Sequence, residues 1–469
     1  MLSRFRLVLL LAPAMLGVGG LFFACGGGSS DAGPETCDGG VCGEAVSPDT
    51  SQGVDVLNPV SDGGGDAATR ATCEDGGFPG MLDPTFGDGG GTYVDPGPDG
   101  YGIAYDVIVQ PDGRTVLAGS VRRSKENGFG LARLSATGAL DTGFGDGGLA
   151  FTPLLPFLAG GGGVKAVTLT ADGRILAGGT LGLTSLNWDL VIARYAPDGA
   201  LDRAFGDGGV AGVTFEPGAG PFESVLGVYG LAALPTGHVV VAAQRGMNAT
   251  ADFVVLKLDP SGSLDTTFGA NGRVTVDIGA SSADHAGHSH ALALQSDGKM
   301  LMVGESNGNM AAIRLEADGS LDPSFGAGGK VVLALGASSV AETVTVDGAG
   351  RIVLGGRIGD QLALVRLTSS GALDSTFGLG GVVRFGRGAV AGIWIQPDGK
   401  YLVAGSISFA RFHPNGAPDL GFGAGGEADA SWPAEISLGS TSLSATAGRQ
   451  RATRGGGRKG AMAAARYCL

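Results

Sequence analysis

A ten-residue phrase recurs along the chain and limits what the chain can fold into. Its first copy, LDPTFGDGGG, covers residues 82–91, and later copies keep the pattern LDxxFG. The phenylalanine of the phrase returns every 45 to 63 residues, at Phe86, Phe144, Phe205, Phe268, Phe325, Phe377 and Phe422. Periods of this length are typical of solenoids, propellers and arrays. Each unit of such a protein buries its apolar surface against neighbouring units.

The unit at residues 104–151 shows what is repeated. AYDVIVQ, RTVLAGS and FGLARLS predict strands because they are rich in Val, Ile and Leu, and LAF begins a fourth strand. PDG and ATGALDTGFGDGG supply the turns, which accounts for part of the high glycine content, 90 residues of 469. Four short antiparallel strands make one blade of a β-propeller. We therefore predict an all-β propeller of four-stranded blades.

The repeated elements resemble the delta-sixty repeat family. The resemblance rests on LDxxFG, on QPDGR and QPDGK at residues 110–114 and 396–400, on VLAGS and LVAGS, and on strands of the LARL type. It covers Leu82 to Gly423. Members of the family are predicted propellers, so the resemblance implies the same fold. It implies no activity or ligand, because the family has no defined biochemical role.

A basic residue in each LARL-type strand lies eight residues before the aspartate of the next LDxxFG copy. We expect each couple to form an ion pair that sets the strand register, with the phenylalanines packed between blades. The six couples are Arg133–Asp141, Arg194–Asp202, Lys257–Asp265, Arg314–Asp322, Arg366–Asp374 and Arg411–Asp419.

Two residues of the same kind are left over, one at each end of the repeat region. Arg466 has no aspartate after it, and Asp83 has no basic residue before it. Pairing them closes a ring of seven blades, in which a strand near 91–94 becomes the outermost strand of the last blade and removes an open edge. The alternative is six blades and a disordered tail after about residue 430, which the basic, glycine-rich stretch at 448–460 favours.

The N-terminus predicts export. Residues 1–25 combine Arg4 and Arg6, an apolar run and a small residue before Cys25, the pattern of a secretory signal. The ending LFFAC resembles a bacterial lipoprotein signal, so we expect a lipidated Cys25 to anchor the protein in the cell envelope, at the outer membrane or the periplasmic face. The alternative is an ordinary signal peptide or a membrane anchor.

The composition then changes twice along the chain. Residues 26–80 are rich in Gly, Ser, Asp and Pro without an apolar period, and we predict a disordered tether. A tether of this length has an end-to-end distance of roughly 40 Å. The propeller domain occupies 81–469, with a degenerate last blade at 430–469.

Four cysteines remain once Cys25 is assigned to the lipid: Cys37, Cys42, Cys73 and Cys468. An even number in an exported protein favours disulfides. Closing the ring would bring Cys73 near Cys468, and we predict that a disulfide between them latches it.

The loops of such a ring divide between two faces. In a four-stranded meander the PDG and LDxxFG turns share one face, and the loops that vary in sequence lie on the other, where binding usually occurs. At the start of the innermost strands, one position would line the mouth of the central opening and forms a candidate ligand site. Its residues are Tyr105, Lys165, Tyr229, His290 and Glu342, with Ala391 in the sixth strand. The alternative is an exposed position that tolerates polar residues.

A histidine cluster raises the question of a metal. His285, His288 and His290 have a spacing that can bind Zn²⁺ or Cu²⁺, although a polar loop without metal is the alternative. No other cofactor is indicated. The net charge of −14 excludes nucleic acid as a partner.

Two functions remain for this chain. The first is a monomeric, non-enzymatic module that binds a protein or glycan ligand through the variable-loop face, and we assign no catalytic residue. The second is a metal-dependent hydrolase or lactonase acting at the propeller mouth.

Overall fold

The structure, a computed structural model, divides the chain into two units, Met1–Asp66 and Ala67–Leu469. The described residues all lie in the second unit: 82–97, 100–123, 126–156, 163–184, 187–213, 225–245, 252–278, 288–405, 408–429, 443–445, 451–458 and 461–468. The tether, Cys25, Cys37, Cys42 and Cys73 therefore lie outside them. Over the part that is described, no helix is present that could cross a membrane.

Seven antiparallel sheets of four strands make up this unit, and we number them as blades 1 to 7. Blade 1 contains β2 (Tyr101–Val109), β3 (Thr115–Arg123), β4 (Glu126–Leu134) and β5 (Leu149–Pro156). Blade 2 contains β6 (Gly163–Leu169), β7 (Ile175–Thr184), β8 (Asn187–Tyr195) and β9 (Val210–Val213). Blade 3 contains β10 (Val225–Ala233), β11 (Val239–Arg245), β12 (Asp252–Leu258) and β13 (Arg273–Val276).

The remaining blades follow the same order up to the last. Blade 4 contains β14 (His288–Leu294), β15 (Met300–Ser306), β16 (Asn309–Leu315) and β17 (Lys330–Leu333). Blade 5 contains β18 (Ser339–Val346), β19 (Ile352–Ile358), β20 (Gln361–Leu367) and β21 (Val382–Phe385). Blade 6 contains β22 (Val390–Ile395), β23 (Tyr401–Gly405), β24 (Ser408–Phe412) and β25 (Glu427–Asp429). Blade 7 contains β26 (Leu443–Ala445), β27 (Arg451–Arg458), β28 (Ala461–Cys468) and β1 (Gly91–Val94).

Blade 7 joins the two ends of the repeat region. Its order is β1-β28-β27-β26, and β1 pairs with β28 from Gly91 opposite Ala465 to Val94 opposite Met462. The prediction of seven blades closed by an N-terminal strand is confirmed. The six-blade alternative with a disordered tail is wrong, because much of the basic stretch at 448–460 forms β27, paired with β28 along its whole length.

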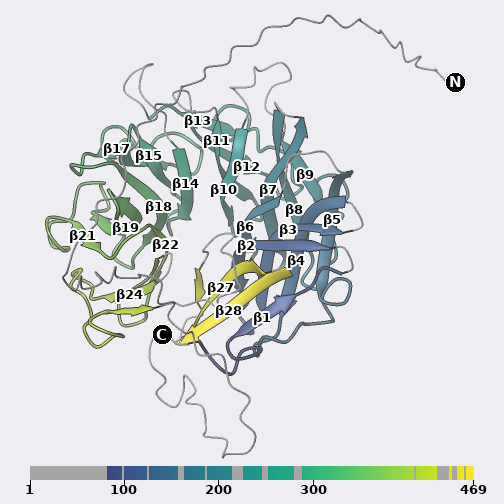
Figure 1. Cartoon of the computed structure of the whole chain (residues 1–469). Helices are drawn as coiled ribbons and strands as arrows, with labels where there is room; N and C mark the ends of the chain where they lie inside the picture. The colour runs from purple at the N-terminus through teal and green to yellow at the C-terminus, as the bar shows by residue number, and fades with distance from the viewer. Residues whose placement is uncertain are drawn as a thin grey trace, which may run out of the picture. The chain divides into compact units, whose positions relative to one another are not determined.

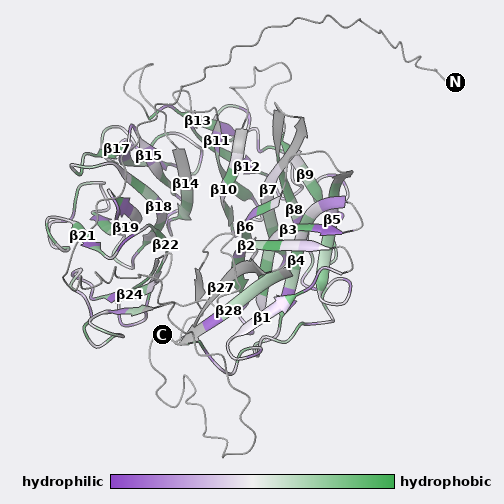
Figure 2. Ribbon diagram, in the orientation of Figure 1, coloured by the Kyte–Doolittle hydropathy of each residue, from purple (hydrophilic) through white to green (hydrophobic). Residues whose placement is uncertain are grey.

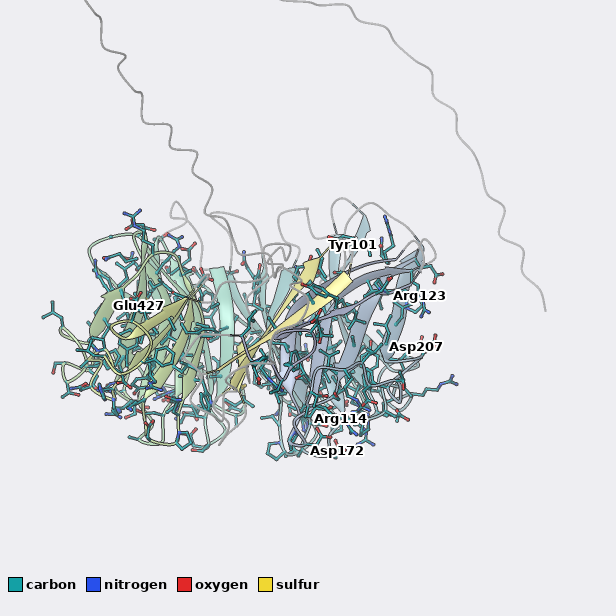
Figure 3. The ribbon with its side chains drawn as sticks, turned by 60° about the horizontal axis from the view of Figure 1, so that its bottom comes forward. Tyr101, Arg114, Arg123, Asp172, Asp207 and Glu427 are labelled. Carbon is teal, nitrogen blue, oxygen red and sulfur yellow. The ribbon has the colours of Figure 1, made fainter. Side chains whose placement is uncertain are left out.

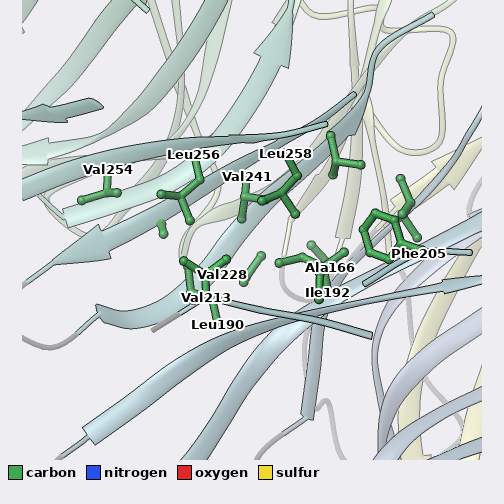
Figure 4. Close-up of a cluster of buried hydrophobic side chains, with 14 residues drawn as sticks. Ala166, Leu190, Ile192, Phe205, Val213, Val228, Val241, Val254, Leu256 and Leu258 are labelled. Carbon is green, nitrogen blue, oxygen red and sulfur yellow. The ribbon is translucent and has the colours of Figure 1, made fainter. Parts of the chain in front are cut away.

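The first strand of each blade lies nearest the centre and packs against the first strand of the next (Figure 1). The apolar core is divided among the seven seams between neighbouring blades, one cluster to each seam. Figure 4 shows the cluster between blades 2 and 3, where Leu190 and Ile192 meet Val241 and Leu256. The middle strands are apolar on both faces because each face is buried against a different blade. Hydrophobic residues are accordingly frequent along the strands, and polar residues are frequent near the strand ends (Figure 2).

The short turns gather on one face of the ring. Arg114 and Asp172, from the turns between the first and second strands of blades 1 and 2, lie at the lower edge in Figure 3, and Tyr101 and Arg123 lie at the upper edge. We call the turns between first and second strands inner turns: 110–114, 170–174, 234–238, 295–299, 347–351 and 396–400. We call the turns that follow the third strands outer turns: 135–138, 196–199, 259–262, 316–319, 368–371 and 413–416.

All seven couples are in contact: the six predicted from the eight-residue spacing and Arg466–Asp83, predicted from closing the ring. In the six couples that contain arginine, Arg466–Asp83 among them, the arginine Nε lies 2.6 to 2.8 Å from the aspartate Oδ2. In the lysine couple, Lys257 Nζ lies 3.1 Å from Asp265 Oδ2. Each cation also lies over the phenylalanine of the same LDxxFG turn, at 4.5 to 5.6 Å from the ring centroid. The ion pair and the cation–π contact hold the third strand and the LDxxFG turn in one register.

The same groups reach the next blade. Arg466 donates through Nη1 to the carbonyl of Ala136 in the outer turn of blade 1, and Gly87 N–H donates to Thr137 at 2.8 Å. Phe86 is fully buried, and its ring lies against Gly138, where any Cβ would press on the ring. Equivalent phenylalanines and glycines meet in the five seams from blade 1 to blade 6. The LDxxFG phrase is therefore a contact between blades as well as a turn. We call the basic residue, the aspartate and the phenylalanine of each such contact a joint.

We expect Arg466→Ala to lower the free energy of unfolding by about 3–5 kcal/mol, because it leaves the buried carboxylate of Asp83 without this cation. Urea unfolding followed by circular dichroism measures the change. Arg466→Lys, which copies the residue type of blade 3, is the matched control and should lose much less. A loss below about 0.5 kcal/mol for Arg466→Ala would show that the closure does not depend on this pair.

Acid should weaken these joints. The Thr267 hydroxyl and, against the opposing effect of burial, the Lys257 ammonium lower the pKa of Asp265 to about 2. The pKa of an aspartate in the unfolded chain is about 3.9. The contribution of Asp265 to the free energy of unfolding is therefore complete above about pH 4 and is lost as the pH falls toward 2. The pKa is lowered in the same direction at Asp141, Asp202, Asp322, Asp374 and Asp419.

We therefore expect the melting temperature to fall steeply between about pH 4 and pH 2, and less steeply in Asp265→Asn. Calorimetry across this range tests it. A melting temperature that stays level below about pH 4 would contradict the assignment.

Candidate functional site

Each inner strand of blades 1 to 6 carries a β-bulge, and the candidate ligand residues occupy these bulges. The register skips Tyr105 in β2, Lys165 in β6 and Tyr229 in β10. It likewise skips His290 in β14, Glu342 in β18 and Ala391 in β22. These residues lie at the second to the fifth position of their strands. A bulge leaves one residue out of the ladder and turns its side chain to a new direction.

A glycine of the VLAGS-type strand makes room for the bulge. The residue opposite the bulge is Gly119 in blade 1, Gly179 in blade 2 and Gly356 in blade 5. A Cβ at any of these three glycines would overlap a carbonyl oxygen of the bulged strand, Ile103, Gly163 and Val340 respectively. The repeated glycine is therefore explained by close backbone approach. Blade 3 has Ala243 at this place.

The bulged side chains reach solvent between buried neighbours. Lys165 is exposed although Val164 and Ala166 on either side are buried. Tyr229 is partly exposed between two buried residues, and Tyr105 and Glu342 are partly exposed after buried alanines. The inner strands form the inner edge of each sheet, so these partly or fully exposed residues belong to the strands nearest the centre of the ring. The backbone is constant from blade to blade, and the side chain differs.

Two of these residues contact one another. The Lys165 ammonium lies 3.7 Å from the centroid of the Tyr105 ring, a cation–π contact between blades 1 and 2. Desolvation by the surrounding protein lowers the pKa of Lys165 even though its side chain is exposed. Burial raises the pKa of Tyr229. Burial also raises the pKa of Glu342, and the positive charge of Arg357 partly offsets the rise.

Asp106, the residue after the bulge in β2, has a structural task. Its carboxylate accepts hydrogen bonds from the amide of Val107 at 2.8 Å and from the amide of Val167 at 2.7 Å. Val167 belongs to β6, so Asp106 ties the inner strands of blades 1 and 2 together. This fixes the Tyr105–Lys165 contact in place.

For the remaining predicted site residues the structure describes the backbone at most. His285 precedes the described part of blade 4, and His288 and His290 lie in β14 without described side chains. Among the residues that are described, no group of three or more His, Cys, Asp or Glu could hold a metal ion. Cys468 ends β28, but neither its side chain nor Cys73 is described. The metal site, the lipidated Cys25 and the disulfide stay predictions.

A serine pattern in blade 4 was missed by the sequence analysis. Gly304–Gly308 reads GESNG and fits the GxSxG pattern of serine hydrolases. That pattern needs a turn from a strand into a helix, whereas Ser306 ends β15 and a hairpin leads directly into β16. Asn307 and Gly308 have φ values of 51° and 70°, as a two-residue hairpin requires. Ser306 is buried and donates to the carbonyl of Ile278, so it is a structural residue.

Comparison with known proteins supports a β-propeller repeat protein. Six segments match the model described as "Domain of unknown function (DUF5122) beta-propeller": residues 110–144, 170–205, 234–268, 295–325, 350–377 and 396–422. Each segment begins in an inner turn and ends at the LDxxFG phenylalanine, so the model covers the joint and the middle strands of a blade. No curated protein matches the chain.

Solved structures that resemble this chain do so weakly. A protein from Lactobacillus plantarum is 12% identical with a TM-score of 0.42, over 68% of this chain and 81% of its own. Sqt1 from Chaetomium thermophilum is 13% identical with a TM-score of 0.39, over 80% and 98%. Prolyl oligopeptidase B from Galerina marginata is 12% identical with a TM-score of 0.43, over 76% and 47%.

We expect Gly356→Ala to destabilise the protein by about 1–3 kcal/mol, because its Cβ would collide with the bulge that presents Glu342. Gly212→Ala is the control, since a Cβ there meets nothing within 4 Å, and it should change stability by less than about 0.5 kcal/mol. Thermal unfolding of the two variants gives the comparison. Equal melting temperatures for the two variants would mean that the bulge can shift to accept a Cβ at Gly356 without loss of stability.

Proposed function

We propose that this chain is a non-enzymatic binding module that holds a protein or glycan ligand over the centre of the ring. The observation that carries the proposal is the bulge ring: one backbone position, repeated in six blades, holds Tyr, Lys, Tyr, His, Glu and Ala. A position with a purely structural role would need similar side chains, as the Arg–Asp–Phe joints have. Varied polar and aromatic side chains on a rigid scaffold are typical of a recognition surface.

The contacts in the ring fit recognition better than catalysis. Lys165 lies over Tyr105, and Asp106 is engaged by two backbone amides. A pre-ordered cation–aromatic pair presents a flat face and a charge without an ordering cost at the moment of binding. A hydrolase or lactonase at this mouth would need metal ligands, and the histidines proposed for that role are the ones whose side chains are not described.

We further propose that the module is exported and held at the cell envelope by a lipid on Cys25. The support is the sequence of residues 1–25 and the glycine-rich stretch that follows it. Metabolic labelling with palmitate, with Cys25→Ser as the control, tests the anchor.

The bulge-ring proposal predicts that Lys165→Ala with Glu342→Ala weakens ligand binding at least about tenfold while the melting temperature stays nearly unchanged, because both side chains reach solvent. Binding is measured on glycan arrays and by capture of envelope proteins. The control is Leu379→Ser, which changes a side chain 89% exposed on a turn away from the inner strands. Equal binding by both variants, or loss of the fold in the double variant, would refute the proposal.

A further inference from the structure

A hollow lies on the short-turn face, away from the variable loops. Its volume is about 640 Å³, within the range of small-molecule sites. It sits in the seam between blades 4 and 5, lined by the inner turn 295–299, the inner turn 347–351 and the outer turn 368–371. None of the bulge-ring residues lines it, so it is separate from the proposed site above.

The sequence explains why this seam is open. The hollow is lined by the second residue of three turns: the inner turn of blade 4 and the inner and outer turns of blade 5. We compare the equivalent positions of the other seams. Of the five seams with described turns, this one has no proline at these positions, but Ser296, Gly348 and Ser369. The others have Pro111, Ala171 and Pro197; Ala171, Pro235 and Pro260; Pro235, Ser296 and Ala317; and Gly348, Pro397 and Pro414. In other blades the outer-turn prolines Pro260 and Pro414 lie 3.4–3.5 Å from a Cβ built on the inner-turn glycine, so serine and glycine at these positions put less bulk between the turns.

The charges that line the hollow are balanced. Lys299 and Arg314 face Asp297 and Asp347, two cations and two anions. Lys299 Nζ already contacts Asp322 at 2.8 Å and Glu316 at 2.6 Å, and Arg314 Nε contacts Asp322 at 2.6 Å. Arg351 Nε contacts Asp347 at 2.7 Å. An ion entering the hollow therefore meets no net charge of opposite sign.

What the hollow offers instead is a set of fixed donors and acceptors. Four serines line it, Ser296, Ser324, Ser369 and Ser370, together with the four charged groups. Two of these hydroxyls are held by neighbours: Ser324 donates to Asp322 at 2.6 Å and accepts from Arg314 at 3.1 Å, and Ser370 is bonded to Thr368 at 2.9 Å. A hydroxyl can donate and accept at once, so a ligand with several hydroxyls matches such a wall. The buried amide oxygen of Gln295 has no partner, but the same holds for Gln110 and Gln396, so this is a property of the repeat and not of the hollow.

We propose that the hollow between blades 4 and 5 binds a small neutral polyhydroxylated ligand, of the size of a mono- or disaccharide. The proposal concerns this seam because none of its three turn positions holds proline, whereas each of the other four seams with described turns has at least one. It does not depend on the bulge ring or on the proposed function.

The test uses the whole propeller and three probes, glucose, galactose and N-acetylglucosamine, titrated by calorimetry, with inorganic phosphate as the charged comparison. We expect a sugar to bind with a Kd of about 1 mM or lower, and phosphate not to bind. Gly348→Trp should weaken sugar binding at least about tenfold, because a Cβ at Gly348 meets nothing within 4 Å and the ring enters open space.

A second variant covers the case in which the tryptophan disturbs the turn. Gly348→Pro with Ser369→Pro restores the residues that other blades carry at these positions, and it should also abolish binding. Ala171→Pro makes the same change in blade 2 and should leave binding unchanged, as should Lys165→Ala with Glu342→Ala. No sugar binding at about 10 mM, preferential phosphate binding, or unchanged binding in both hollow-filling variants would overturn the proposal.

Discussion

The joint of arginine, aspartate and phenylalanine is the interaction on which the ring depends. One cation is shared by a carboxylate, an aromatic ring and, in the arginine joints that reach across, a carbonyl of the following blade. Most of these arginines and aspartates are buried, and a buried cation is tolerated only when its partners are complete. The joint therefore specifies strand register and blade spacing together. Its last copy, between Arg466 and Asp83, links residues 383 positions apart and turns a row of blades into a ring.

A second constraint acts at the inner strands. The bulge and, in blades 1, 2 and 5, the glycine opposite it fix the backbone, so the bulged side chain can change without disturbing the sheet. Each repeat therefore has two kinds of position. The joint residues, which hold the blades together, stay nearly the same from blade to blade, and the bulged residue varies. Asp106 is an exception in which one blade has added a hydrogen-bonded tie of its own beside a bulge.

On the short-turn face the turns are similar from blade to blade, and a few substitutions distinguish one seam. These turns look uniform because LDxxFG and the inner turns must fit the neighbouring blade. Small departures, serine or glycine where proline is common, have no effect on the joint but open space between turns. One hollow of about 640 Å³ results where three such departures meet. A face that looks purely structural in sequence can in this way hold a site.

The sequence by itself determined the repeat, the four-strand unit, the seven joints and the closure by an N-terminal strand. The repeat, the four-strand unit and six of the joints follow from local patterns, because strand periodicity, turn glycines and an eight-residue spacing between opposite charges all lie within one unit. The closure and the seventh joint follow from the two joint residues left over at the ends of the repeat region, Asp83 and Arg466. Even the positions of the candidate ligand residues were found by aligning units, although their bulges were not, since a bulge is defined only by the register against a partner strand. The GESNG pattern in blade 4 can be read from the sequence, but only the structure shows that a hairpin and not a helix follows Ser306. Only the tertiary structure decided which of the candidate ligand side chains reach solvent and where turns from different blades leave a hollow, because both depend on distances between strands and turns far apart in sequence, which no local pattern records.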